Sequence, residues 1–197
     1  MSKTVECFFD VGSPASYLAW TQLPSIAQRQ QAQIIWKPML LGGVFKATGN
    51  QSPLMIPAKG TFMQADLARY AQRYGVPMQF NPFFPINTLQ LMRGAIACQQ
   101  LGQLDAYLNA VFPALWAKGL DMIQADIVAD VLQSGGLDPD PVFSLASSAP
   151  VKTSLIANTD EAIARGVFGA PALFVNDTLF FGQDRLDWVE RDLAAQA

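Results

Sequence analysis

The stretch Phe8-Phe9-Asp10-Val11-Gly12-Ser13-Pro14-Ala15-Ser16-Tyr17, near the start of the chain, decides the fold. Strand-forming apolar residues run up to Phe9, and the following turn of Asp10, Val11 and Gly12 ends the run. Ser13 can cap a helix that begins at Pro14, because serine is a favoured N-cap and proline suits the first helical position. The stretch therefore predicts a strand, a turn and a helix in direct succession.

The start of this predicted helix is a place that favours an anion. The first backbone N–H groups of a helix lack partners, and the helix dipole is positive at that end. In thioredoxin-like redox proteins this place holds Cys-x-x-Cys, whereas here the same frame reads Ser13-Pro14-Ala15-Ser16. A serine cannot exchange disulfides, but its hydroxyl can donate a hydrogen bond to a thiolate that another molecule brings.

The composition is that of an ordered globular protein. The chain has 197 residues, of which 51% are hydrophobic and 15% charged, so it fits one domain or one domain with a large insertion. The net charge of −3 provides no basic field, so we expect no nucleic-acid partner. No secretory leader or membrane-spanning run is visible, so we expect a cytoplasmic protein without a membrane partner.

The cysteine and histidine content narrows the possible chemistry. Cys7 and Cys98 lie far apart in apolar stretches, form no Cys-x-x-Cys pair and are expected as buried core thiols. The chain contains no histidine, which excludes Ser-His-Asp and Cys-His catalysis and most zinc sites, so no metal site is expected. An enzyme of this composition must borrow its reactive group, use carboxylates or lysine, or use a cofactor.

The first part of the chain predicts parallel strands. Residues 4–10 and 33–37 have the pattern of strands, and residues 14–30 that of the helix between them. This spacing is typical of a right-handed βαβ unit, and the first strand is apolar enough to lie centrally in a sheet. Residues 40–57 are rich in Gly, Pro, Ser and Asn and predict a long loop, with a short helix near residues 44–46.

Helical patterns dominate the middle of the chain, and strands return near its end. The expected helices cover residues 59–74, 88–101, 105–118, 124–133, 141–147 and 151–165. Residues 171–175 and 178–181 then predict a β-hairpin, and a final helix runs to about Ala195.

The order of these elements predicts an α/β fold of the thioredoxin-like type. Strands and helices follow as β-α-β, then a large all-helical insertion, then β-β-α. We expect residues 1–40 and 166–197 to form the thioredoxin-like domain, and residues 41–165 to form a loop plus a helical insertion domain.

The loop before the predicted hairpin contains Pro171 at the start of a strand. A proline is tolerated there because it need not donate to the strand ladder. In thioredoxin folds this loop faces the start of the first helix, and a cis-proline leaves the preceding backbone free to pair with a peptide-like ligand. The context favours a cis bond at Pro171; the alternative is an ordinary loop proline.

An ordered set of motifs across almost the whole chain resembles the 2-hydroxychromene-2-carboxylate isomerase family and the related kappa-class glutathione transferases, both of the DsbA-like thioredoxin superfamily. The motifs are Ser13-Pro14-x-x-Tyr17-Leu18, Gly49-Asn50-x-Ser52-Pro53, Pro57-Ala58-Lys59-Gly60, Val167-Phe168-Gly169-x-Pro171 and Gly182-x-Asp184-Arg185. None of them is decisive alone, but their order is highly specific.

The resemblance implies bound glutathione and a role for each motif. Ser13 would contact the glutathione sulfur and help to ionise it, as the catalytic residue. The backbone of Ala170, before Pro171, would pair with the cysteinyl unit. A serine hydroxyl and a helix N-terminus both favour a thiolate over a thiol, so these roles agree with the chemistry of the residues.

The remaining implied residues would hold the two ends of the tripeptide. Asn50 and Lys59 would reach it from the long loop, with Lys59 on the glycyl carboxylate, while Asp184 and Arg185 would hold the γ-glutamyl end. The charges suit a zwitterion, which needs an anionic partner for its ammonium and cationic partners for its carboxylates. Each has a plain structural alternative: Asp184 could cap the last helix, Arg185 could be solvated, and Lys59 could simply begin its helix.

The resemblance implies an enzyme, a glutathione-dependent isomerase in aromatic catabolism. It would interconvert 2-hydroxychromene-2-carboxylate and trans-o-hydroxybenzylidenepyruvate-type compounds by reversible addition of the thiolate. Its partners would be a small aromatic carboxylate, glutathione and a second copy of the chain in a homodimer. Two alternatives remain open: a kappa-class-like glutathione transferase or peroxidase, and a non-catalytic thioredoxin-fold protein that binds glutathione or a peptide.

Overall fold

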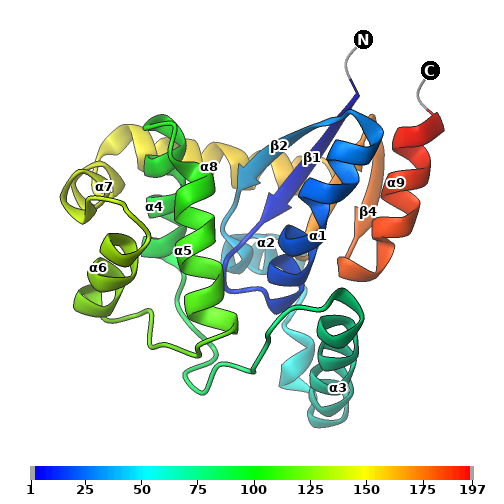
Figure 1. Ribbon diagram of the computed structural model, residues 1–197, viewed down its shortest axis with the longest axis horizontal. Helices are drawn as coiled ribbons and strands as arrows, with labels where there is room; N and C mark the ends of the chain where they lie inside the picture. The colour runs from blue at the N-terminus through cyan, green and yellow to red at the C-terminus, as the bar shows by residue number, and fades with distance from the viewer. Residues whose placement is uncertain (1–2, 196–197) are drawn as a thin grey trace.

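A four-stranded mixed sheet forms the centre of the protein (Figure 1). The structure is a computed structural model that describes residues 3–195. β1 (Thr4–Phe9) pairs in parallel with β2 (Gln33–Pro38) and antiparallel with β3 (Ala172–Val175), which pairs antiparallel with β4 (Thr178–Phe181). The parallel first pair, the central first strand and the hairpin predicted from the sequence are confirmed.

β1 supplies side chains to two separate cores because successive residues of a strand point to opposite faces. Val5, Cys7 and Phe9 join the large core shared with the helices, whereas Phe8 joins a smaller cluster on the other face. Phe9 packs edge-to-face on Trp36 of the neighbouring strand, with ring centroids 5.7 Å apart. The strand is thus buried on both faces, as its apolar sequence indicates.

Helix α1 (Pro14–Gln30) begins where the sequence predicts. Ser13 is its N-cap, and the Ser13 Oγ accepts a hydrogen bond from the Ser16 N–H at 3.2 Å. Pro14 occupies the first turn, where its missing N–H leaves no helical bond unmade. The helix ends at Gln31, which adopts a left-handed backbone with φ of 54°.

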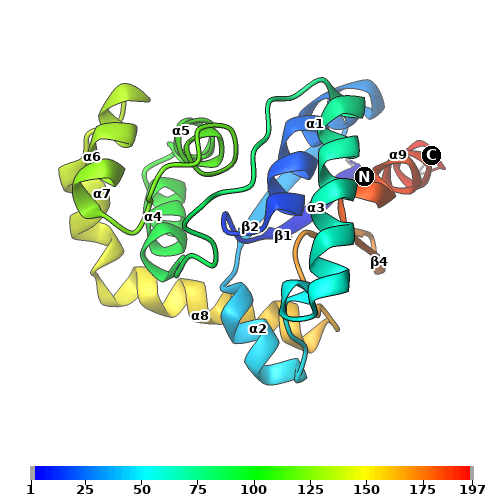
Figure 2. The same cartoon turned by 90° about the horizontal axis from the view of Figure 1, so that it is seen from below.

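The predicted loop over residues 40–57 is the main local error. The structure places helix α2 (Leu41–Thr48) and the short 3₁₀-helix η1 (Pro53–Met55) there, followed by α3 (Pro57–Tyr74), which runs beside α1 (Figure 2). α2 has no capping side chain of its own, but the Leu41 N–H donates to the Asp10 carboxylate at 2.9 Å. A partner so distant in sequence gives no local signal.

The other helices follow the predicted pattern to within a few residues at each end. They are α4 (Leu89–Gln100), α5 (Leu104–Trp116), α6 (Ala125–Ser134), α7 (Pro139–Ala146), α8 (Ala149–Ala164), the 3₁₀-helix η2 (Gln183–Arg185) and α9 (Leu186–Ala195). Helices α4 to α7 gather on one side of the sheet, and α8 extends from them to β2 (Figure 1). Within residues 3–195, no helix is long and apolar enough to cross a membrane.

The predicted division into a domain of residues 1–40 and 166–197 and an insertion of residues 41–165 stays a prediction. Its first and last two residues lie outside the described residues. The proposed insertion contacts the sheet through an ion pair, because Lys37 of β2 lies 2.9 Å from Glu161 of α8. Helix α8 therefore contacts both the sheet and the helical group.

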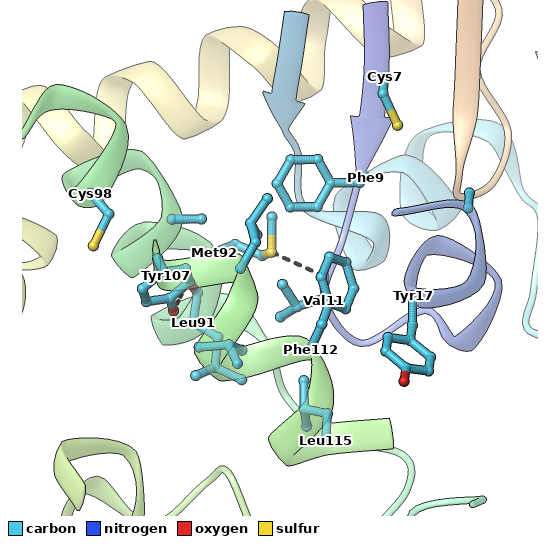
Figure 3. Close-up of a cluster of buried hydrophobic side chains, with 14 of the residues drawn as sticks. Cys7, Phe9, Val11, Tyr17, Leu91, Met92, Cys98, Tyr107, Phe112 and Leu115 are labelled. Carbon is cyan, nitrogen blue, oxygen red and sulfur yellow. Dashed lines mark hydrogen bonds between the residues drawn. The ribbon is translucent and has the colours of Figure 1, made fainter. Parts of the chain in front are cut away.

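The large core joins the sheet to the helical group through α4 and α5. Figure 3 shows Phe9, Val11, Met92 and Phe112 meeting there, with the Val11 N–H donating to the Met92 sulfur at 3.3 Å. The helices approach closely at Gly94, where an added Cβ would lie 2.6 Å from the Tyr107 Oη. That hydroxyl is fixed because it donates to the Leu91 carbonyl at 2.6 Å.

Both cysteines are buried in this core and form no disulfide. Burial raises the pKa of the Cys7 thiol far above its ordinary value and raises the pKa of Cys98 to about 12. The thiol form is therefore dominant at neutral pH, and the thiolate is the reactive form. Neither cysteine sulfur is therefore placed to act as a nucleophile.

We expect Gly94→Ala to destabilise the protein by about 1–3 kcal/mol, because its new methyl group meets the fixed Tyr107 hydroxyl. Gly42→Ala is the control: it lies in the first turn of α2, and nothing lies within 4 Å of its added Cβ. We expect this control to leave the stability unchanged or to raise it by less than about 1 kcal/mol. Urea unfolding of the two variants measures both effects, and equal effects would contradict the close approach of α4 and α5.

We expect the two thiols of the folded protein to react with a thiol-specific chromogenic reagent about 100-fold more slowly than those of the urea-unfolded chain. The reason is that burial removes both access and thiolate character. Stopped-flow absorbance at neutral pH measures the rates. A thiol that reacts at the unfolded rate in the native protein would contradict the buried placement.

Candidate functional site

The sheet register brings two distant loops to one edge of the sheet. β1 and β3 are antiparallel, with Phe8 opposite Ala172. The turn that follows β1 and the loop that precedes β3 therefore emerge side by side. The first of these loops leads to Ser13, and the second contains Ala170 and Pro171.

Ser13 contacts the loop before β3 directly. Its Oγ donates to the Ala170 carbonyl oxygen at 2.8 Å, across 157 residues of sequence. The side chain is well enclosed, since Ser13 is only 5% exposed. The structure thus brings together two of the residues predicted for the site, a hydroxyl donor at a helix start and the backbone before Pro171.

The Ala170–Pro171 peptide bond is cis, as the fold context favours. The Pro171 carbonyl accepts a hydrogen bond from the Gly182 N–H at 3.0 Å, which ties this loop to the end of β4. Asn50 reaches the same loop, because its Nδ2 donates to the Phe168 carbonyl at 2.7 Å. Asn50 therefore lies near Ala170 in space, although its contact in the structure is with the loop backbone.

Asp184 and Arg185 lie in η2, just beyond β4, and contact each other. The Arg185 Nη1 donates to the Asp184 Oδ2 at 2.6 Å. Asp184 lies within the 3₁₀-helix, whose N-cap is Gly182, so it does not occupy an N-cap position there. The Tyr74 hydroxyl of α3 donates to the neighbouring Gln183 carbonyl at 2.7 Å and anchors this turn.

Lys59 lies in the first turn of α3, and its side chain is exposed. That turn contains no acidic residue, and none of the ion pairs formed among residues 3–195 involves Lys59. A lysine at the positive end of a helix dipole is unfavourable for the helix alone. The same placement attracts an anion, because the charge and the free N–H groups act together.

The buried carboxylate of Asp10, which was not predicted as a site residue, fixes the turn that leads to Ser13. Asp10 is 2% exposed, and its Oδ1 accepts from the Gly12 N–H at 2.9 Å. Its Oδ2 accepts from the Leu41 N–H at 2.9 Å and from the Thr88 hydroxyl at 3.0 Å. Burial raises the pKa of the Asp10 carboxyl, and the hydrogen bonds from Leu41, Gly12 and Thr88 oppose that rise.

Asp10 thereby joins the turn before Ser13 to the starts of α2 and α4. The Asp10 carbonyl also accepts from the Ser13 N–H at 3.0 Å. Gly12 is required between them, because an added Cβ would lie 2.5 Å from the Thr88 Cγ2. The one sequence signal for this arrangement is an acidic residue at the end of an otherwise apolar strand.

The site offers hydrogen-bond donors and acceptors rather than an internal nucleophile. Ser13 provides a hydroxyl at a helix N-terminus, and Ala170 provides a carbonyl. Asp184 and Arg185 follow Gly182, which is bonded to Pro171, whereas no hydrogen bond or ion pair among residues 3–195 joins Lys59 to this group. Among residues 3–195, no three His, Cys, Asp or Glu side chains gather as a metal site would require.

Comparison with known proteins identifies the family. Residues 4–194 match the model of the DSBA-like thioredoxin domain. The 2-hydroxychromene-2-carboxylate isomerase of Sphingobium xenophagum is 33% identical over 193 residues, which cover 96% of this chain and 97% of that protein. Glutathione S-transferase kappa 2 of Caenorhabditis elegans is also 33% identical, over 98% of this chain and 92% of that protein.

A solved structure of a 2-hydroxychromene-2-carboxylate isomerase superposes with a TM-score of 0.86 at 32% identity, covering 95% of this chain and 93% of that chain. The thioredoxin-like fold predicted from the order of the elements is therefore confirmed. The chain belongs to the DSBA-like thioredoxin family and, within it, to the 2-hydroxychromene-2-carboxylate isomerase family.

Proposed function

We propose that this protein is a glutathione-dependent isomerase in the breakdown of aromatic compounds. It would interconvert 2-hydroxychromene-2-carboxylate and trans-o-hydroxybenzylidenepyruvate-type compounds, as the names of its relatives from Sphingobium xenophagum and Pseudomonas putida suggest. The observation that carries the proposal is the Ser13 hydroxyl, enclosed at the start of α1 and 2.8 Å from the Ala170 carbonyl. It lies where a thiol-bearing peptide could meet both groups.

The residues implied for the site carry groups that suit those of glutathione. The Ala170 carbonyl is an acceptor suited to a peptide N–H, and Asn50 contacts the same loop through its bond to the Phe168 carbonyl. Lys59 carries an exposed charge for the glycyl carboxylate. Asp184 and Arg185 would hold the γ-glutamyl end, with Asp184 on the ammonium and Arg185 on the carboxylate, which requires their mutual bond to be shared with the ligand.

The chemistry that glutathione would supply is reversible addition of its sulfur to the conjugated system of the substrate. The protein would position the two molecules and stabilise the anionic sulfur. The Ser13 hydroxyl and the N-terminus of α1 both favour negative charge at this position. The core thiols Cys7 and Cys98 have no part in this, since both are buried away from solvent.

A kappa-class-like transferase or peroxidase is the second candidate, favoured by the 33% identity to glutathione S-transferase kappa 2. An isomerase regenerates glutathione, whereas a transferase leaves it in the product and a peroxidase oxidises it. Quantifying free thiol before and after complete turnover separates these reactions. Calorimetry with glutathione and the aromatic substrate separates both enzymes from a non-catalytic protein, which would bind glutathione or a peptide without turnover.

A homodimer and a cytoplasmic location stay predictions, as does the identity of the aromatic carboxylate. The homodimer is what the family resemblance implies, and the cytoplasmic location was expected from the sequence pattern. Light scattering of the purified protein measures the oligomeric state directly.

We expect Ser13→Ala to fold and to lose about 10²-fold or more of its turnover, as removal of a hydrogen-bond donor to a reacting anion does in other enzymes. The variant also loses the N-cap of α1, at a cost of about 1 kcal/mol. Turnover with 2-hydroxychromene-2-carboxylate and glutathione is followed by absorbance.

Ser148→Ala is the matched control for the lost cap. Ser148 caps α8, with its Oγ accepting from the Val151 N–H, and it lies outside the proposed site. This control should lose similar stability and keep its turnover. If Ser13→Ala turns over at the wild-type rate, Ser13 is not a catalytic residue.

A further inference from the structure

The hydroxyl of Ser13 is already engaged in the free protein. A serine hydroxyl has one proton and two lone pairs. The proton is donated to the Ala170 carbonyl at 2.8 Å, and a lone pair accepts the Ser16 N–H at 3.2 Å. Ser13 therefore has no second proton for a sulfur anion, and to donate to one it must release the Ala170 carbonyl.

Releasing the Ala170 carbonyl is unfavourable unless another donor replaces the hydroxyl. Ala170 is only 8% exposed, and within residues 3–195 no second donor is bonded to its carbonyl oxygen. A buried acceptor without a partner loses its hydrogen bond and regains little from solvent. The protein offers no replacement donor, so the ligand must bring one.

The geometry permits the proton to move while the oxygen stays in place. The Ser13 Oγ is held by the Ser16 N–H, and the Ser13 backbone N–H is held by the Asp10 carbonyl at 3.0 Å. Rotation about the Cβ–Oγ bond redirects the O–H without disturbing either contact. The N-cap of α1 therefore survives whichever acceptor the proton faces.

We infer that the Ser13 hydroxyl is a ligand-operated switch, whose proton turns from the Ala170 carbonyl to the ligand sulfur only when the ligand donates its own N–H to that carbonyl. The inference rests on the proposed function, because it concerns the same sulfur. No covalent bond of the protein changes, and the proton that leaves the thiol goes to solvent. The ligand class is then an N-acylated cysteinyl peptide, and a bare thiol cannot operate the switch.

The direct test compares glutathione with its depsipeptide analogue, in which an ester oxygen replaces the cysteinyl amide N–H. Both are titrated on the wild-type protein, and the ultraviolet absorbance of the thiolate gives the thiol pKa of each bound ligand. We expect the protein to lower the thiol pKa of glutathione by about one unit or more, which is a tenfold rise in thiolate at a pH below both pKa values. The protein should lower the thiol pKa of the depsipeptide analogue far less.

A second measurement uses S-methylglutathione, which has an N–H but no thiol to ionise. In Ser13→Ala the Ala170 carbonyl has lost its donor, so the ligand N–H satisfies a vacant acceptor. We expect this variant to bind S-methylglutathione several-fold more tightly than wild type, by calorimetry. A fixed contact between Ser13 and the ligand predicts equal or weaker binding, and Ser148→Ala should bind as wild type does.

The outcomes separate the switch from the proposed function. Equal pKa shifts for glutathione and its depsipeptide analogue would overturn the switch and leave the glutathione site intact. If the analogue does not bind, the S-methylglutathione comparison decides, and unchanged or weaker binding by Ser13→Ala overturns the switch. If glutathione itself does not bind or keeps its solution pKa, the proposed function fails and the switch fails with it.

Discussion

The hydrogen bond from the Ser13 hydroxyl to the Ala170 carbonyl is the contact on which the site depends, because it joins two chain segments that are 157 residues apart. The sheet makes it possible: Phe8 lies opposite Ala172 in an antiparallel pair, so the turn after β1 and the loop before β3 leave at one edge. The Asp10 carboxylate then fixes the turn by accepting from Gly12, Leu41 and Thr88. The sheet register and the Asp10 carboxylate together fix the turn that carries Ser13 next to Ala170.

The parts of the fold that local patterns specify were predictable from the sequence. The strand, turn and helix around Ser13 were predictable because strand-forming residues, a capping serine and a proline occur in the order that those elements require. The short helix expected near residues 44–46 lies within α2, but its start at Leu41 was missed, because one of its first N–H groups finds a partner in Asp10, 31 residues earlier.

The site was predictable in its topology and less so in its contacts. Ser13 and Ala170 were expected to face each other, since the fold places those two loops together, and the structure confirms that they do. The bond from Asn50 to the Phe168 carbonyl and the pairing of Asp184 with Arg185 depend on side-chain positions that no spacing rule specifies. The roles of all the predicted site residues toward a ligand, those of Ser13 and Ala170 included, stay predictions.

A thioredoxin-type frame with serines in place of its cysteines cannot exchange disulfides, yet it has a helix N-terminus and, facing it, a loop with a cis-proline. Because Cys7 and Cys98 are buried, the function that we propose requires a ligand to bring the reactive sulfur. A crystal structure grown with saturating glutathione tests this most directly. The account predicts the tripeptide sulfur within hydrogen-bonding distance of the Ser13 Oγ and the cysteinyl N–H directed at the Ala170 carbonyl. A crystal structure with no glutathione beside Ser13 and Pro171, or with glutathione bound elsewhere, would contradict it.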